Sequence, residues 1–149
     1  ILYRLVGSEM CIRDSGKISE GTNIEDAVTF ANKSNIDAMA ISVGNTHLQT
    51  SKKASIDFNK INLIEAKTKI PLVLHGSSGI PVEQRKKLAR KTKVAKLNIG
   101  TEIRMTFGEA LRKNLKNNPK TYDRLQLLKP TIKDLTKVTK KIIKQIGPN

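Results

Sequence analysis

The chain has 149 residues, enough for one compact domain with a hydrophobic core, and it carries 28 lysines and arginines against 13 aspartates and glutamates. Its single cysteine cannot close an intramolecular disulfide, and two histidines with one thiol cannot form a cysteine-rich zinc finger. No apolar run approaches the roughly 20 residues that a membrane-spanning helix needs, so we expect no membrane partner and a cytoplasmic protein.

The net charge of +15 is compatible with nucleic-acid binding, because a basic face attracts phosphate backbones. The lysines are nevertheless scattered from Lys17 to Lys144, and aromatic residues, which stack on single-stranded bases, make up only 3% of the chain. We therefore interpret the charge as a solvated surface and expect no nucleic-acid partner. A nucleic-acid-binding module remains the alternative, and steep salt dependence of binding would be its signature.

The first fifteen residues, ILYRLVGSEMCIRDS, differ from the rest of the chain. They show neither a helical nor a strand period and no signal-peptide cleavage pattern. The stretch resembles translated sequencing-adapter sequence. We therefore expect residues 1–15 to be a non-native segment without function and residues 16–149 to be the native part, with further native sequence missing on its N-terminal side.

From residue 24 onward, segments of helical period alternate with short apolar runs. A helix is predicted over 24–33, capped by Thr22 or Asn23, with two carboxylates in its first turn. The run 37–43 is almost continuously apolar, which is typical of a parallel strand buried on both faces. The same alternation predicts, in order, a helix over about 57–68, a strand over 71–75, a helix over 81–91 and a strand over 94–98.

The chain ends in helices, predicted over about 101–116, 122–128 and 130–145. The last of these is amphipathic and is expected to pack on the sheet or on a second subunit. Strands that alternate with helices of this length form a parallel sheet with right-handed crossovers. The pattern therefore predicts an α/β fold and leaves two architectures open, a doubly wound sheet or part of a (β/α)8 barrel.

The residues that could bind a ligand follow the three predicted strands. These segments read GNTH over 44–47, HGSSG over 75–79 and NIGT over 98–101. Ligands bind at the carboxyl ends of strands in parallel α/β folds, and both histidines, His47 and His75, lie there. Nitrogen ligands from neighbouring strand ends suit a catalytic zinc ion. Because two ligands are too few, at least one more has to come from outside this segment.

The glycine-rich turns over 75–80 and 98–101 offer backbone N–H groups in front of a helix N-terminus, an arrangement that holds phosphate. Ordinary turn geometry remains the alternative for both turns. Arg104, one turn into the following helix, can neutralise a phosphate or form an ion pair with Glu102 or Glu109. We prefer the ion pair.

Several segments together resemble the class II, zinc-dependent fructose-bisphosphate aldolases, including the tagatose-bisphosphate branch of that family. They are IDAMA over 36–40, VGNTH over 43–47, IDF over 56–58, IPLVLHGSSGIP over 70–81 and AKLNIGTEIR over 95–104. The resemblance extends from about residue 22 to the C-terminus, and the segment PLVLHGSSGIP is highly specific. It implies the C-terminal half of a (β/α)8 TIM barrel, with about strands six to eight present.

Carried over residue by residue, the resemblance implies that His47 and His75 are two of three zinc-binding histidines. It also implies a site for dihydroxyacetone phosphate and its phosphate group, built from two segments. The residues of this site are Gly76, Ser77, Ser78, Asn98, Ile99, Gly100 and Thr101.

The implied reaction is the zinc-dependent cleavage of fructose 1,6-bisphosphate into dihydroxyacetone phosphate and glyceraldehyde 3-phosphate in glycolysis and gluconeogenesis, a lyase reaction. The family's proton-transferring aspartate matches no residue here. We therefore expect the 149-residue chain to be inactive alone, and we assign structural roles to Asp26, Asp37 and Asp57. Leu48 replaces the glycine that in the family contributes to the phosphate and monovalent-cation site.

The implied partners are the sugar bisphosphate and dihydroxyacetone phosphate, and the whole protein is expected to be a homo-oligomer. The same residues are compatible with two alternative functions. One is a tagatose-bisphosphate aldolase of the same family. The other is a noncatalytic half-barrel that binds sugar phosphate without zinc, whose affinity a chelator would leave unchanged.

Overall fold

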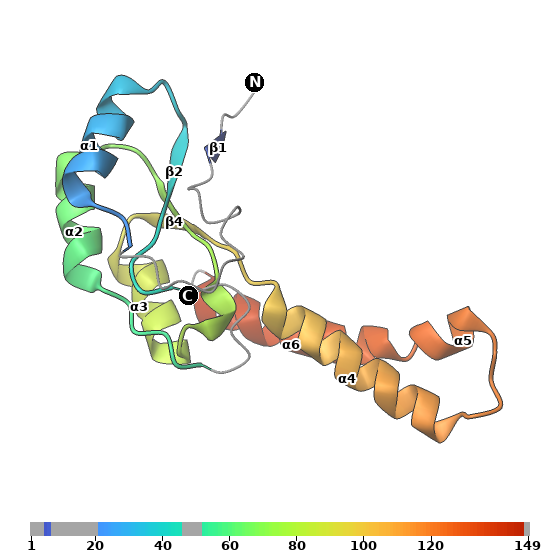
Figure 1. The fold of residues 1–149 in the computed structure, drawn as a ribbon. Coiled ribbons are helices and arrows are strands. Elements are labelled where there is room, and N and C mark those ends of the chain that lie inside the picture. The colour runs from blue at the N-terminus through green and yellow to red at the C-terminus, as the bar shows by residue number, and fades with distance from the viewer. Residues whose placement is uncertain (1–4, 7–20, 46–51, 148–149) are drawn as a thin grey trace.

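The computed structural model describes residues 5–6, 21–45 and 52–147, which form a parallel sheet flanked by helices (Figure 1). The elements in chain order are β1 (Leu5–Val6), α1 (Ile24–Lys33), β2 (Ala38–Ile41), α2 (Phe58–Lys67), β3 (Leu72–Leu74), the 3-10 turn η2 (Ser77–Gly79), α3 (Val82–Lys91), β4 (Val94–Leu97), α4 (Thr101–Asn117), α5 (Arg124–Leu128) and α6 (Thr131–Ile146). Every helix and strand expected from residue 24 onward is present, with its ends within about two residues of the prediction.

The sheet has the strand order β1-β2-β3-β4, and all neighbouring strands are parallel. The prediction of three strands, with no strand in residues 1–15, was wrong at one point. Residues 5 and 6 pair in parallel with Ala38 and Met39 of β2. A strand of two residues is too short to carry a detectable alternation of apolar and polar positions, so its pairing could not be inferred from the pattern.

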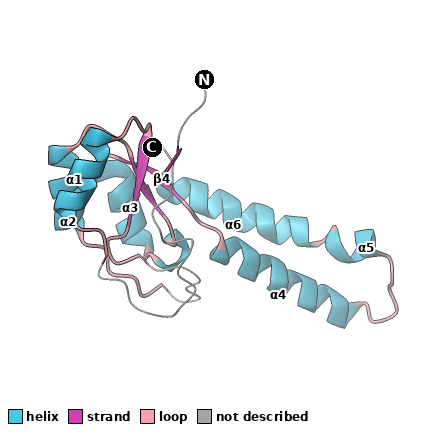
Figure 2. Ribbon diagram, turned by 45° about the horizontal axis from the view of Figure 1, so that its top comes forward, coloured by secondary structure: helices cyan, strands magenta, loops and turns pink. Residues whose placement is uncertain are grey.

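The hydrophobic core lies between the sheet and the helices α1, α2 and α3, which gather on one side of the strands (Figure 2). Met39 and Ile41 of β2 pair with Leu72 and Leu74 of β3, and all four belong to this core. Ala40, between the two core residues of β2, faces the opposite side of the sheet and is buried as well. β2 is therefore buried on both faces, as its apolar run predicted.

Local hydrogen bonds explain where the first two helices begin. Asn23 caps α1, because its side-chain oxygen accepts a bond from the N–H of Asp26 at 3.1 Å. Thr22, the other candidate cap, instead bonds β2, since its hydroxyl accepts from the N–H of Ser42 at 2.7 Å. Asp57 caps α2 in the same way as Asn23 caps α1.

We call the sheet with α1, α2 and α3 the body, and α4, α5 and α6 (residues 101–146) the arm. α4 and α6 run side by side away from the body, and α5 connects them at the far end (Figure 1). α6 also contacts α3, so the expectation that the last helix packs on the sheet domain is confirmed. Ile142 of α6 is buried, whereas Ile132 and Ile143 are exposed.

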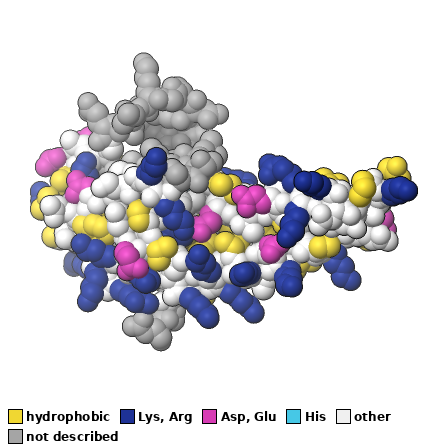
Figure 3. All heavy atoms as spheres, turned by 90° about the horizontal axis from the view of Figure 1, so that it is seen from below, with side chains coloured by type: hydrophobic (Ala, Val, Ile, Leu, Met, Phe, Trp, Pro, Cys, Tyr) yellow, Lys and Arg dark blue, Asp and Glu magenta, His cyan; other side chains and the backbone are white. Residues whose placement is uncertain are grey.

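Lysine and arginine side chains are spread over the body and the arm on the face seen in Figure 3, with carboxylates and hydrophobic side chains between them. This distribution agrees with the scattered positions of the lysines in the sequence. Within the described residues, no helix combines the length and the apolar character needed to cross a membrane.

Candidate functional site

The carboxyl ends of β2, β3 and β4 meet at one edge of the sheet. The register aligns Ile41 with Leu74 and Leu74 with Leu97, so the segments that follow the three strands are neighbours. The buried Asn45 connects the first two of these segments. Its side-chain oxygen accepts a bond from the N–H of Val43 at 2.7 Å, and its amide donates to the carbonyl of His75 at 2.9 Å. His47 and Leu48 lie outside the described residues.

His75 stands directly after β3 and is half-buried. The side-chain amide of Asn98, which follows β4, lies 3.1 Å from its Nδ1 atom. The backbone of Asn98 is tied to β3 as well, because its N–H donates to the carbonyl of Leu74 at 2.8 Å. The candidate metal ligand and a candidate substrate-binding residue are therefore in direct contact.

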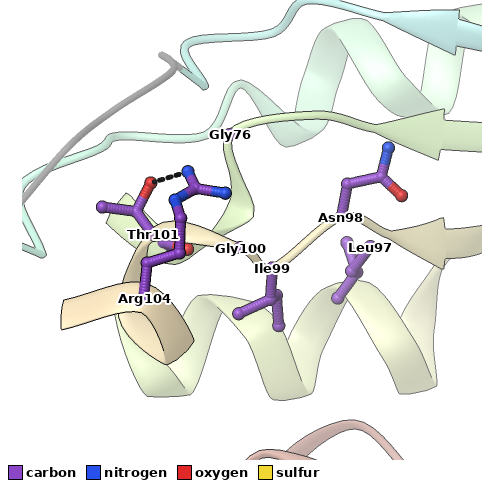
Figure 4. Close-up of a pocket in the computed structure, with 8 residues that line it drawn as sticks. Gly76, Leu97, Asn98, Ile99, Gly100, Thr101 and Arg104 are labelled. Carbon is purple, nitrogen blue, oxygen red and sulfur yellow. Dashed lines mark hydrogen bonds between the residues drawn. The ribbon is translucent and has the colours of Figure 1, made fainter. Parts of the chain in front are cut away.

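A cavity of about 380 Å³ opens beside these residues at the N-terminus of α4 (Figure 4). Its lining comes from the turn after β3 and from the segment between β4 and α4. The lining residues are Gly76, Ser78, Leu97, Asn98, Ile99, Gly100, Thr101 and Arg104. Both segments that the sequence predicted for the substrate and its phosphate thus face one cavity.

Ser77 is the one predicted site residue of the two segments that supports the cavity rather than lining it. It is fully buried, and its polar groups are bonded within the protein. Its N–H donates to the carbonyl of Asn98 at 3.1 Å, and its hydroxyl donates to the carbonyl of Leu74 at 3.1 Å. For Ser77 to donate a hydrogen bond to a ligand, one of these bonds would have to break.

Two glycines shape the cavity. Gly76 has φ 62°, a left-handed conformation that glycine adopts at little cost, and it turns the chain from β3 into η2. At Gly100 a Cβ atom would come within 2.8 Å of the Nη1 atom of Arg104, so the missing side chain leaves room for this guanidinium beside the backbone.

Arg104 lines the cavity, and its Nη2 atom donates to the hydroxyl of Thr101 at 3.1 Å (Figure 4). The preferred expectation of an ion pair with Glu102 or Glu109 was wrong: the ion pairs of the described residues do not include Arg104, and Glu102 is bound to two other cations. Its carboxylate oxygens lie 2.6 Å from Nη2 of Arg85 and 3.1 Å from Nζ of Lys52. The guanidinium of Arg104 therefore lies at the cavity and not in an ion pair with Glu102.

Glu102 keeps its negative charge at the N-terminus of α4. Burial alone would raise the pKa of its carboxyl, but the hydrogen bond and charge of Arg85, followed by those of Lys52, hold that pKa below its usual value. The sequence analysis missed Arg85. Helical spacing could have indicated it, because Arg85 lies three residues before the buried Leu88 and therefore on the same inward face of α3.

The described residues do not form a metal centre by themselves. Nowhere in 5–6, 21–45 and 52–147 do three or more histidine, cysteine, aspartate or glutamate side chains gather closely enough to hold a metal ion. His75 is the one histidine in these ranges, and it sits beside the cavity. A zinc site at His75 would need at least two further protein ligands from outside these residues.

Comparison with known proteins identifies the family. The sequence model of the family described as "Fructose-bisphosphate aldolase class-II" matches residues 4–149. The sulfofructosephosphate aldolase of Alkalicoccus urumqiensis is 34% identical over 119 residues, which make up 80% of this chain and 41% of that protein.

Solved structures of aldolases have a similar fold. The YdjI aldolase from Escherichia coli K12 aligns with a TM-score of 0.66 and 26% identity, over 85% of this chain and 44% of that one. The fructose-bisphosphate aldolase (Fba) from Campylobacter jejuni aligns with a TM-score of 0.65 and 19% identity, over 85% of this chain and 45% of that one, which supports the fold alone.

The chain spans 41% to 45% of the length of these relatives. Of the two architectures that the sequence left open, the partial (β/α)8 barrel is confirmed, with helices on one side of a parallel sheet and the candidate residues at the carboxyl ends of its strands. The chain belongs to the class-II fructose-bisphosphate aldolase family.

Proposed function

We propose that the protein containing this chain is a metal-dependent lyase that cleaves fructose 1,6-bisphosphate into dihydroxyacetone phosphate and glyceraldehyde 3-phosphate, and catalyses the reverse condensation. The observation that carries the proposal is the cavity beside His75, lined by both predicted segments. Six of its lining residues were predicted for dihydroxyacetone phosphate from the sequence. They are Gly76, Ser78, Asn98, Ile99, Gly100 and Thr101.

The cavity has the properties of an anion site. It opens at the first residue of α4, Thr101, where the helix dipole favours negative charge and the first N–H groups lack partners within the helix. The guanidinium of Arg104 lies on its wall and adds a full positive charge. A phosphate group placed here would gain both interactions, and Gly76, which has no side chain, would let it approach the backbone closely.

For the metal, we propose that His47 and His75 supply two ligands and that the remaining protein ligand lies outside the described residues. The side-chain amide of Asn98, 3.1 Å from the Nδ1 atom, helps to hold the ring of His75 in place. A zinc ion bound there would supply a Lewis acid that polarises the ketose carbonyl. A monovalent cation near the phosphate is a further proposal, on the family resemblance.

The second candidate function is cleavage of a related ketose phosphate. The 34% identity to a sulfofructosephosphate aldolase favours a sulfonated ketose phosphate, and the resemblance to the family includes tagatose bisphosphate. All three substrates have a phosphorylated ketose end that would bind in the cavity beside His75. The sulfonated ketose phosphate differs from fructose 1,6-bisphosphate at the other end of the molecule, and tagatose bisphosphate differs in its configuration at C4. A noncatalytic sugar-phosphate-binding protein is the remaining alternative. Because sugar phosphates are metabolites of the cytoplasm, we propose that the protein acts there, as a homo-oligomer.

The test is an assay of triose phosphate release by the full-length protein with each of the three substrates. We expect cleavage that chelation abolishes and zinc restores, with the highest kcat/KM for fructose 1,6-bisphosphate. His75→Ala is expected to lose bound zinc, measured by elemental analysis, together with activity. The 149-residue chain alone serves as the control and is expected to be inactive.

The outcomes separate the candidates. A higher kcat/KM for the sulfonated ketose phosphate or for tagatose bisphosphate would replace the proposed substrate. Sugar-phosphate binding without cleavage, at an affinity that chelation leaves unchanged, would support the noncatalytic protein. Cleavage that persists after complete removal of metal would contradict the metal-dependent reaction.

A further inference from the structure

The largest fully buried side chain among the described residues is a charged one, Arg85 of α3. Its Nε atom donates to the carbonyl of Ser77 at 3.1 Å, and its Nη2 atom donates to the carbonyl of Ser78 at 2.8 Å and to the carboxylate of Glu102 at 2.6 Å. Its Nη1 atom donates to the side-chain oxygen of Gln145 at 3.3 Å. Burying a charge is costly, and these four bonds compensate the cost.

The two backbone carbonyls belong to η2, the turn that lines the cavity. In a trans peptide the C=O group and the following N–H group point to opposite sides. By holding the carbonyl of Ser77, Arg85 therefore directs the N–H of Ser78 away from itself. Ser78 lines the cavity, whereas Arg85 is not among the lining residues. The guanidinium thus acts on the cavity through the peptide groups of the turn.

The same guanidinium connects the turn to α4. The N–H of Glu102 donates to the hydroxyl of Ser78 at 3.2 Å, while the carboxylate of Glu102 binds Arg85. The carboxylate also binds Lys52, which belongs to the segment after β2. Arg85 and Glu102 therefore join the segments that follow β2, β3 and β4, and both segments that line the cavity are fixed to one ion pair, of which Arg85 is fully buried.

We propose that Arg85 is a positioning residue of the phosphate site: it sets the orientation of the Ser78 peptide and of the first turn of α4, and so presents the N–H groups of Ser78 and Thr101 to a phosphate group that it does not touch. This inference rests on the proposed function, because it takes the cavity as the phosphate site. The positive charge behind the turn also polarises its peptide groups, which strengthens the N–H groups as donors.

The geometry requires an arginine. A guanidinium is a planar fork that can satisfy two carbonyls and a carboxylate at fixed angles, whereas the ammonium of lysine is a compact charge on a flexible stem. Arg85→Lys therefore keeps the charge but cannot hold the carbonyls of Ser77 and Ser78 and the carboxylate of Glu102 together. Arg85→Met keeps much of the volume and removes every donor.

Two control variants separate the structural role of the buried guanidinium from the effect of its positive charge. Gln145→Met removes the bond between the guanidinium and α6 but leaves its bonds to the turn and to Glu102. Arg90→Met removes a guanidinium from the exposed side of the same helix. Gln145→Met thus reports on the structural support given by the buried guanidinium, and Arg90→Met on the loss of one positive charge.

The experiment measures binding of inorganic phosphate to the full-length protein by calorimetry, the thermal midpoint by circular dichroism, and kcat and KM for fructose 1,6-bisphosphate. We expect Arg85→Lys and Arg85→Met to weaken phosphate binding by about tenfold or more, the size of a lost charge-assisted hydrogen bond. KM should rise by a similar factor, with a smaller change in kcat. Gln145→Met should lower the midpoint without changing phosphate affinity, and Arg90→Met should change neither.

Equal phosphate affinity in Arg85→Lys and wild type would overturn the inference. So would a loss of affinity in Gln145→Met as large as in Arg85→Lys, because the role of Arg85 would then be structural only. A wild-type protein that binds no phosphate would contradict the proposed function instead. If neither Arg85 variant folds, Glu102→Gln tests the inference, because it weakens the bond from Arg85 to α4 at nearly constant side-chain volume. Unchanged phosphate affinity in Glu102→Gln would then overturn the inference.

Discussion

Glu102 links two cations at the start of α4, and its ionisation decides whether the ion pair with Arg85 exists. Burial opposes the charged form, but the hydrogen bond and charge of Arg85, and then those of Lys52, lower the pKa of Glu102 below its usual value of 4.5. A group with a lowered pKa in the folded state adds stability at pH values above its unfolded pKa. This contribution is lost as the pH falls through the folded pKa.

The resulting prediction concerns the free energy of unfolding as a function of pH. Glu102→Gln is expected to be less stable than wild type at neutral pH, and the difference should shrink as the pH is lowered from about 4.5 through the folded pKa. Urea unfolding between pH 7 and pH 3 measures it. Glu83→Gln is the control, because Glu83 pairs with Lys86 on the surface and its removal should change stability by less than about 0.5 kcal/mol. A difference for Glu102→Gln that is the same at pH 3 and pH 7 would show that the carboxylate charge is not involved.

At the scale of residues, the sequence predicted the two turn segments that line the cavity, but it did not predict the partners of the charged side chains. The glycine-rich turn and the segment over 98–101 were recognisable from local sequence alone, and residues of both line one cavity. The role of Arg85 depends on acceptors in Ser77, Ser78 and Glu102, which the fold brings to it. The partner of Arg104 was predicted wrongly for the same reason, since Glu102 was already bound to Arg85.

At the scale of elements, the first turn of α2 tests the structural role assigned to Asp57. Its side chain accepts a hydrogen bond from the N–H of Lys60 at 2.9 Å. Asp57→Ala is expected to lower the free energy of unfolding by about 1 kcal/mol, whereas Asp57→Asn, which also caps helices well, should cost only a few tenths of that. Thermal or urea unfolding measures both. If Asp57→Ala abolished aldol cleavage at unchanged stability, Asp57 would belong to the chemistry instead.

The helices were predictable because their signals are local. Asn23 and Asp57 mark the starts of α1 and α2, Pro81 precedes α3, and apolar residues at helical spacing give the lengths. β1 was missed because its two residues are defined only by pairing with β2, which is distant in sequence. The apolar run of β2 is long enough to be recognised by itself.

At the scale of the whole molecule, the arm and the cavity are connected through two helices. α4 begins at the cavity wall and continues into the arm, and α6 returns from the arm to α3. Gln145 near the end of α6 binds Arg85, which in turn holds the turn after β3. The docking of α6 on the body therefore includes a hydrogen bond to the residue that holds the turn after β3.

Two adjacent isoleucines of α6 test this docking. Ile142 lies three residues before Gln145, on the same face of the helix, and is 6% exposed, whereas Ile143 is 56% exposed. Ile142→Ala should lower the free energy of unfolding by about 2–4 kcal/mol, because it removes buried methyl groups and leaves a cavity. Ile143→Ala, the matched control, should cost less than about 1 kcal/mol in urea unfolding of the same protein. If the two variants were equally destabilised, Ile143 would be covered in the folded protein, and the arm would have a second contact surface beside the one that it makes with α3.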